Sequence, residues 1–253
     1  MTDLTGKVAL VTGAGQGVGQ GIALALSAAG CALVLAGRTL EKVEAVATQI
    51  EERGAKALAL GCDVKSASDL AATVDRAVEE FGGLDILVNN AQEVPLGTFE
   101  DVSDEAFVAG FESGPLASFR LMKLARPHMA KRGGGTIINL ASSAGIRWDM
   151  GGFGPYGAVK QAVRALTRAA ASEFGGDNIR VLTVAPHAES PGLKWWIENN
   201  PEEAEAFFRT IPLGRIGRLE EDIGAAVAAL CGPQMAYLTG ATIPLDGGQA
   251  NFD

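Results

Sequence analysis

The chain contains 253 residues, of which 47% are hydrophobic and 20% are charged, and its formal net charge is −9. This balance is typical of a compact globular protein and excludes a disordered or fibrous chain. An acidic chain without a Lys/Arg cluster argues against a nucleic-acid partner. Three dispersed cysteines and two histidines give no metal-ligand spacing, so we expect no metal site.

Residues 8–37 contain no charged side chain, and this stretch exceeds the roughly 20 residues that span a bilayer. Glycines and polar residues interrupt it, so a buried strand, a loop, a buried helix and a second strand explain it better. The first residues have no signal-peptide pattern, and the scattered cysteines suit a reducing compartment. We therefore expect a cytoplasmic protein without a membrane segment.

Short apolar runs alternate with amphipathic segments along the whole chain. The apolar runs predict strands over residues 7–13, 31–37, 56–64, 84–91, 135–142, 179–186 and 240–248. Helical periodicity predicts helices over residues 19–30, 39–54, 66–82, 107–131, 155–174 and 221–230, and an irregular, aromatic-rich insertion over 190–211. This alternation predicts an α/β fold: a single-domain, doubly wound parallel sheet of about seven strands with helices on both faces, covering residues 1–253.

A glycine-rich loop joins the first predicted strand to the first helix. Thr12, Gly13, Gly17 and Gly19 fit the spacing T-G-x-x-x-G-x-G, whereas the spacing G-x-G-x-x-G is absent because position 20 is Gln20. Small residues there let backbone N–H groups approach an anion at the helix N-terminus. The context of a preceding strand and a following helix favours a phosphate-binding loop over a glycine turn without a ligand.

The second strand ends at Gly37 and Arg38. A chain that binds NAD has an acidic residue in this region, which holds the adenosine ribose hydroxyls. This stretch offers a cation and no carboxylate, which suits the 2′-phosphate of NADP. We therefore predict NADP(H) in preference to NAD(H), the alternative being that Arg38 is a solvated loop residue.

Tyr156 and Lys160 lie one helical turn apart, so their side chains share one helix face. The ordinary pKa of tyrosine is about 10, and a neighbouring cation favours the phenolate and lowers it. The pair alone is equally compatible with a tuned proton donor and with a core tyrosine beside a surface lysine.

Together with these features, the chain resembles the short-chain dehydrogenase/reductase family over nearly its whole length. Further matching pieces follow the family's order: Asp63-Val64, Asn89-Asn90-Ala91, Asn139, Pro186 and Asp246-Gly247-Gly248. The resemblance implies a Rossmann-type fold, a small-molecule substrate and a homo-oligomer, either a tetramer or a dimer. It implies that cofactor contacts come from Gly13, Gln16, Gly17, Val18, Gly19, Arg38, Asp63, Val64, Asn90, Ala91, Tyr156, Lys160 and Pro186.

The resemblance also implies catalytic roles. Tyr156 would donate a proton to a carbonyl oxygen or accept one from an alcohol, and Lys160 would lower its pKa and hydrogen-bond the nicotinamide ribose. A serine would hydrogen-bond the reacting oxygen. Counting from Asn139 selects Ser142, whereas counting back from Tyr156 selects Ser143; we prefer Ser142 because the strand fixes its place.

Three positions depart from the family pattern. Gln92 replaces a glycine near the cofactor, and Gly114 stands where the family has a catalytic asparagine, so that Ser113 or a water is left to replace the amide. His187 follows Pro186 in place of a glycine, where it either contacts substrate or packs. We include Gln92 and His187, with Ser142 and Ser143, among the candidate substrate contacts.

The insertion at 190–211 falls where the family has its substrate lid. Trp195 and Trp196, with Trp148 before the tyrosine, would form an apolar cover and indicate a hydrophobic or cyclic substrate. The alternative is that these aromatic side chains fill an oligomer interface. Two functions follow: an NADP-dependent carbonyl reductase or alcohol dehydrogenase, and a dinucleotide-binding sensor or partner subunit with reduced or lost catalysis.

Overall fold

The computed structural model describes residues 2–147 and 151–250. Seven parallel strands form one sheet in the order β3-β2-β1-β4-β5-β6-β7, which confirms the predicted doubly wound α/β fold. Their bounds are β1 (Val8–Thr12), β2 (Ala32–Gly37), β3 (Ala57–Gly61), β4 (Ile86–Asn89), β5 (Gly135–Leu140), β6 (Ile179–Pro186) and β7 (Thr242–Leu245). The central strands are apolar and buried, as expected for a parallel sheet covered on both faces.

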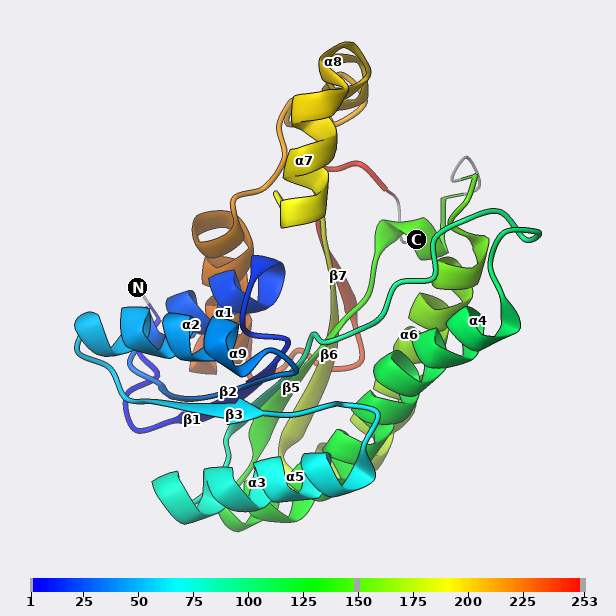
Figure 1. The fold of residues 1–253 in the computed structure, drawn as a ribbon. Helices are drawn as coiled ribbons and strands as arrows, with labels where there is room; N and C mark the ends of the chain where they lie inside the picture. The colour runs from blue at the N-terminus through cyan, green and yellow to red at the C-terminus, as the bar shows by residue number, and fades with distance from the viewer. Residues whose placement is uncertain (1, 148–150, 251–253) are drawn as a thin grey trace.

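Helices cover both faces of the sheet (Figure 1). One layer holds α1 (Gly17–Ala28), α2 (Leu40–Glu52) and α9 (Ala225–Cys231), and the other holds α3 (Ala67–Phe81), α5 (Ala117–Lys131) and α6 (Gly154–Phe174). Each layer has its own apolar core against the sheet, one including Ile22, Val46 and Val227 and the other including Leu70, Leu121 and Phe174. The remaining helices are α4 (Asp104–Phe111), α7 (Pro191–Asn199) and α8 (Pro201–Phe208).

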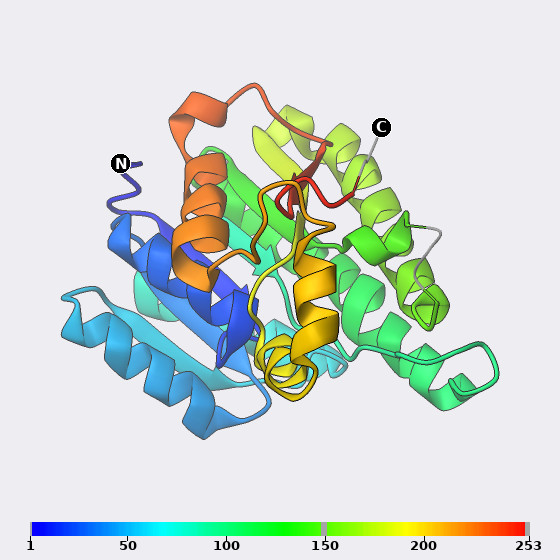
Figure 2. The same ribbon diagram turned by 90° about the horizontal axis from the view of Figure 1, so that it is seen from above.

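The strand order of the sheet changes direction between the neighbouring strands β1 and β4. Successive strands run outward from β1 to β3 and then outward from β4 to β7. The loops that follow β1 and β4 therefore leave in opposite directions and open a crevice at the carboxyl ends of the strands, where ligands of such sheets bind. Figure 2 shows α7 and α8 over the middle of the molecule when it is viewed from above.

The predicted helix over 107–131 differs from the structure in two ways. It begins earlier, at Asp104, because the Ser103 hydroxyl accepts a hydrogen bond from the Ala106 N–H and caps α4. A π-helical segment, η1 (Glu112–Leu116), also separates α4 from α5 and contains Pro115. A proline lacks the N–H of the regular helical ladder, and this accounts for the local widening.

The prediction of an irregular insertion over 190–211 is wrong, because α7 and α8 occupy most of it. The Ser190 hydroxyl accepts a hydrogen bond from the Leu193 N–H, and Pro191 and Pro201 each begin a helix. A proline in the first helical turn costs little, since its missing N–H has no intrahelical partner there. None of the helices within the described residues is long and apolar enough to cross a membrane.

Candidate active site

The glycine loop after β1 is braced by the chain that follows β4. The Thr12 hydroxyl accepts hydrogen bonds from the backbone N–H groups of Asn90 and Ala91, at 3.0 and 3.1 Å. The Asn90 side chain donates in turn to the carbonyl oxygens of Thr12 and Gly13, at 2.9 and 3.2 Å. A Cβ at Gly13 would lie 2.7 Å from Asn90 Nδ2, and the φ of Gly13 is +64°. The two predicted motifs therefore form one rigid unit that needs glycine at this position.

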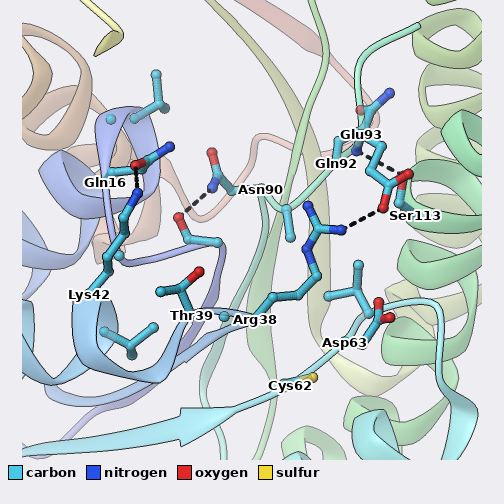
Figure 3. Close-up of a pocket in the computed structure, with 18 of the residues that line it drawn as sticks. Gln16, Arg38, Thr39, Lys42, Cys62, Asp63, Asn90, Gln92, Glu93 and Ser113 are labelled. Atoms are coloured by element: carbon cyan, nitrogen blue, oxygen red, sulfur yellow. Dashed lines mark hydrogen bonds and ion pairs between the residues drawn. The ribbon is translucent and has the colours of Figure 1, made fainter.

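A cleft of about 400 Å³ opens beside this unit, a volume suited to a small molecule. Figure 3 shows its wall, which is contributed by the loops after β1, β2, β3 and β4. It contains most of the predicted cofactor contacts: Gly13, Gln16, Gly17, Val18, Arg38, Asp63, Val64, Asn90 and Ala91. Gly19 instead packs against Asn90 beneath the loop. The first turn of α1 carries no acidic side chain, so the N-terminus of this helix fits the pyrophosphate of a dinucleotide.

Arg38 faces a carboxylate that its own stretch of sequence lacks. Arg38 Nη1 lies 2.7 Å from Glu93 Oε1, and Lys65 Nζ lies 2.9 Å from the same oxygen (Figure 3 shows the first contact). Lys42 donates to Gln16 Oε1 at 2.8 Å on the opposite side of the cleft. Glu93 comes from the loop after β4, so Arg38 has a carboxylate partner in the assembled fold although its own stretch of sequence contains none.

Tyr156, Lys160 and Ser142 come together beside the sheet. Tyr156 and Lys160 lie on α6, with Lys160 Nζ 5.5 Å from the tyrosine ring centroid, and the Ser142 hydroxyl hydrogen-bonds Tyr156. Lys160 is buried, and its Nζ donates to the Leu140 carbonyl at 2.7 Å. Ser142 caps a short 3-10 turn that begins at Ser143. The geometry thus pairs Ser142 with the tyrosine.

Burial shifts the pKa values of Tyr156 and Lys160 in opposite directions. Burial raises the pKa of Tyr156 to about 12, and the hydrogen bond with Ser142 offsets only part of that rise. Burial lowers the pKa of Lys160 to about 7, so the lysine itself is only partly charged at neutral pH. The expected lowering of the phenol pKa, by Lys160 together with the positive ring of the cofactor, concerns the site with its dinucleotide and stays a prediction.

A chain of buried amides fixes α6 to the sheet. Asn89 ends β4 and pairs with Asn139 of β5, and Asn89 Nδ2 donates to Asn139 Oδ1 at 2.7 Å. Asn139 Nδ2 donates to Thr167 Oγ1 on α6 at 2.9 Å. Because the amide ladder reaches α6, it orients the helix that carries Tyr156 and Lys160.

The departures at Gln92 and Gly114 meet in space. A Cβ on Gly114 would lie 3.2 Å from Gln92 Cδ and 3.3 Å from Gln92 Nε2. Ser113 is buried, donates to the Ala109 carbonyl at 2.7 Å and accepts from the Glu93 N–H at 2.9 Å. Since the Ser113 proton is held within its own helix, this hydroxyl does not replace an amide as a donor.

The predicted substrate contacts are not gathered in the cleft. Trp195 on α7 is 63% exposed, and Trp196 packs edge-on against Phe207 of α8. The His187 ring also packs edge-on against Phe207, and burial lowers its pKa while Asp246 opposes that change. Trp148 lies outside the described residues. The predicted cofactor contact Pro186 ends β6, is half-buried and does not line the cleft. Among the substrate candidates that the structure describes, only Gln92 lines the cleft.

Glu93, Lys65 and Lys42 were not predicted as site residues. Their sequence signal is weak, because each is a single charged residue beside a matching motif. Only the pairing of distant loops brings them to Arg38 and Gln16. No group of side chains suited to a metal ion occurs in the part of the chain that the structure describes.

Comparisons with known proteins agree with this geometry. A family model described as enoyl-(acyl carrier protein) reductase matches residues 13–250. A 12α-hydroxysteroid dehydrogenase from Clostridium sp. is 37% identical over 251 residues, which cover 96% of each chain. A 7α-hydroxysteroid dehydrogenase from Escherichia coli is 33% identical over 246 residues, covering 97% of this chain and 94% of the relative.

Solved structures show the same similarity in three dimensions. A 7α-hydroxysteroid dehydrogenase in complex with NADH and 7-oxo glycochenodeoxycholic acid superposes with a TM-score of 0.92 at 33% identity, covering 98% of this chain and 96% of that one. A short-chain alcohol dehydrogenase from Sinorhizobium meliloti gives a TM-score of 0.91 at 36% identity, covering 98% and 97%. Family model, relatives and fold coincide over the same span, and the chain belongs to the short-chain dehydrogenase/reductase family of oxidoreductases, which bind a nicotinamide dinucleotide.

Proposed function

We propose that the protein is an NADP(H)-dependent oxidoreductase that interconverts a carbonyl and a secondary alcohol on a hydrophobic or cyclic substrate. The observation that carries this proposal is the hydrogen bond between Ser142 and a half-buried Tyr156, one helical turn from a buried Lys160. A phenol held between a hydroxyl and an amine, on a helix fixed to the sheet, is suited to proton transfer. Reduced or lost catalysis is the alternative, and the assembled trio argues against it.

The bound dinucleotide supplies the hydride in this proposal, and the chain handles the proton. With a pKa of about 12, Tyr156 keeps its proton at neutral pH and donates it to the substrate carbonyl oxygen. Ser142 donates a hydrogen bond to the same oxygen and stabilises the charge that develops there. Lys160 holds a proton behind the phenol, and its pKa of about 7 suits rapid exchange of that proton with solvent.

The preference for NADP(H) rests on the cations around the cleft. Arg38 directly follows β2, where the 2′ position of the adenosine ribose would lie, and Lys65 is close by. A 2′-phosphate carries more negative charge than the single carboxylate of Glu93. It would therefore compete with Glu93 for these two cations. The 7α-hydroxysteroid dehydrogenase that superposes with this chain was solved with NADH, so in our proposal the preference for NADP(H) is a property of this chain and is not carried over from that structure.

The substrate class follows from the relatives and from the apolar helices near the cleft. Both hydroxysteroid dehydrogenases act, by name, on alcohols of a fused-ring skeleton, and α7 and α8 carry Trp195, Trp196 and Phe207. We infer that α7 and α8 cover the substrate as a lid. We also infer a homo-oligomer, since exposed apolar side chains gather on α4 and α5. We infer a cytoplasmic protein from the free cysteines, which suit a reducing compartment.

The test is consumption of NADPH and NADH by the purified protein with aliphatic, aromatic and oxosteroid ketones. We expect turnover of at least one cyclic ketone, a higher kcat/KM with NADPH than with NADH, and loss of that preference in Arg38→Leu. Tyr156→Phe removes only the phenolic oxygen, so we expect turnover to fall by about 10² to 10⁴ while NADPH binding is unchanged.

Retained turnover in Tyr156→Phe would overturn the role of this residue. Cofactor binding without turnover anywhere in the panel would instead favour a dinucleotide-binding sensor or partner subunit. Circular dichroism and thermal unfolding of each variant provide the control for folding.

A further inference from the structure

The side-chain amide of Gln92 occupies the space that a side chain at position 114 would fill. A Cβ built on Gly114 would lie 3.2 Å from Gln92 Cδ, 3.3 Å from Gln92 Nε2 and 3.1 Å from Val159 Cγ1. Distances this short are tighter than ordinary van der Waals contacts, so alanine at 114 would press on the amide. Glycine at position 114 therefore leaves the space in which the Gln92 amide packs.

The amide nitrogen of Gln92 makes no hydrogen bond to the described part of the chain. Gln92 Nε2 is buried, and no hydrogen-bond acceptor reaches it among residues 2–147 and 151–250. A buried amide without a partner destabilises a protein, because it has given up its hydrogen bonds with water. Such a group calls for a partner from outside the polypeptide, either a water or a bound ligand.

The location of Gln92 indicates that this partner is a bound ligand. Gln92 lines the cleft that accommodates the dinucleotide, beside Glu93 and Ser113 (Figure 3). Val159, the residue that precedes Lys160 on α6, lies beside Gly114 as Gln92 does. The amide therefore sits at the junction between the cofactor cleft and the helix that carries Tyr156 and Lys160.

We propose that Gln92 is a ligand-binding residue of the active site, whose Nε2 donates a hydrogen bond to an acceptor oxygen of the molecules held at the inner end of the cleft. Gly114 keeps the amide in place by leaving room for it. The acceptor oxygen belongs either to the cofactor or to the substrate. This inference rests on the proposed oxidoreductase function, and it adds to that function a specific donor and its supporting glycine.

The first test is Gln92→Leu, which retains the bulk of the side chain and removes the amide. Because the variant no longer buries an unpartnered donor, we expect its melting temperature without ligands to rise by about 2 to 4 °C. We expect ligand recognition to weaken by about threefold to tenfold, the value of one neutral hydrogen bond. If Gln92 only stabilised the fold, its replacement would lower the melting temperature. A ligand-binding role and a structural role therefore predict changes in melting temperature of opposite sign.

Two binding measurements locate the acceptor. Fluorescence titration with NADPH gives the cofactor Kd without turnover, and steady-state kinetics gives KM and kcat for the ketone. A weaker Kd in Gln92→Leu places the acceptor on the cofactor, whereas an unchanged Kd with a lower kcat/KM places it on the substrate. Unchanged Kd and unchanged kcat/KM together would overturn the proposal.

The second test is Gly114→Ala, which leaves Gln92 intact and pushes its amide away. Gly110→Ala is the matched control, because its Cβ would crowd Pro95 at 3.0 Å and Val159 at 3.3 Å on the same helical stretch without meeting Gln92. We expect Gly114→Ala to reproduce the functional loss of Gln92→Leu, with the double variant no worse than either single one. Additive functional losses in the double variant would contradict the proposal that Gly114 makes room for the Gln92 amide.

The inference and the proposed function fail in distinguishable ways. If the wild-type protein turns over no ketone, the proposed function fails, and the NADPH Kd of Gln92→Leu alone decides the role of the amide. If the wild-type protein turns over ketones and Gln92→Leu matches it in Kd and kcat/KM, the function stands and the inference fails.

Discussion

Lys160 is an amine enclosed by protein, and its folded-state pKa of about 7 lies well below the ordinary value of 10.5. Between these two values the unfolded chain binds one more proton than the folded chain. The free energy of unfolding therefore rises with pH across that window. Burial of the charged amine lowers the free energy of unfolding most at and below neutral pH. At that pH, Lys160 therefore destabilises the fold while it keeps a proton close to Tyr156.

We predict that the free energy of unfolding rises by on the order of 1 kcal/mol between about pH 7 and about pH 8.5, and that Lys160→Met removes this rise. His187 and the cysteines also titrate close to this window, but both proteins retain them, so their contributions cancel in the difference between the two pH profiles. Urea unfolding of both proteins at several pH values measures the difference. Parallel pH profiles would contradict it.

At the scale of elements, α6 depends on a buried polar connection to the sheet. Asn139 receives a hydrogen bond from Asn89 of β4 and donates one to Thr167 of α6. The Thr167 hydroxyl donates a hydrogen bond to the Val163 carbonyl oxygen at 2.9 Å. Removing the Thr167 hydroxyl would leave Asn139 Nδ2 buried without its oxygen acceptor.

We therefore predict that Thr167→Val lowers the free energy of unfolding by about 1 to 3 kcal/mol, the cost of an unsatisfied buried donor. Thr48→Val on α2 is the matched control, because Thr48 is exposed and also donates to the carbonyl four residues earlier, that of Glu44. Its change should stay within about 0.5 kcal/mol. Chemical denaturation of both variants decides the matter, and equal losses would show that the connection contributes nothing.

The sheet and most helices were predictable because each is encoded by a local pattern of apolar residues. The helices α7 and α8 were missed since Pro191 and Pro201 suggest irregular chain, although a proline in a first turn begins a helix. The pairing of Arg38 with Glu93 spans 55 positions, and the depth at which Tyr156 is buried depends on the whole fold. Neither property has a signal in a short stretch of sequence.

At the scale of the whole molecule, one face of α4, η1 and α5 remains apolar and uncovered. The exposed fractions are 37% for Phe107, 52% for Val108, 37% for Leu116 and 43% for Phe119. Phe107 stacks edge-on against Phe111 with ring centroids 5.0 Å apart, which holds these side chains together. A contiguous apolar patch of this kind marks a protein interface.

We predict that the protein assembles through this face and that Val108→Asp shifts it to the monomer, because a charge buried in an apolar interface has no partner. Light scattering coupled to gel filtration should report a dimer or tetramer for the wild-type protein. Thr48→Asp, on the exposed side of α2, adds the same charge and should leave the assembly unchanged. A wild-type monomer, or an oligomer that persists in Val108→Asp, would exclude this face.

The shared carboxylate of Glu93 has a consequence for how cofactor choice can change. Arg38 directly follows β2, and Glu93 lies on the loop that follows β4. The positive and negative groups that would face the ribose in our proposal thus come from two separate loops, and neither belongs to the sheet. We therefore expect that a change of charge on either loop alters the balance between the two cofactors at little cost to folding. On this proposal, cofactor preference is free to vary while the architecture stays constant.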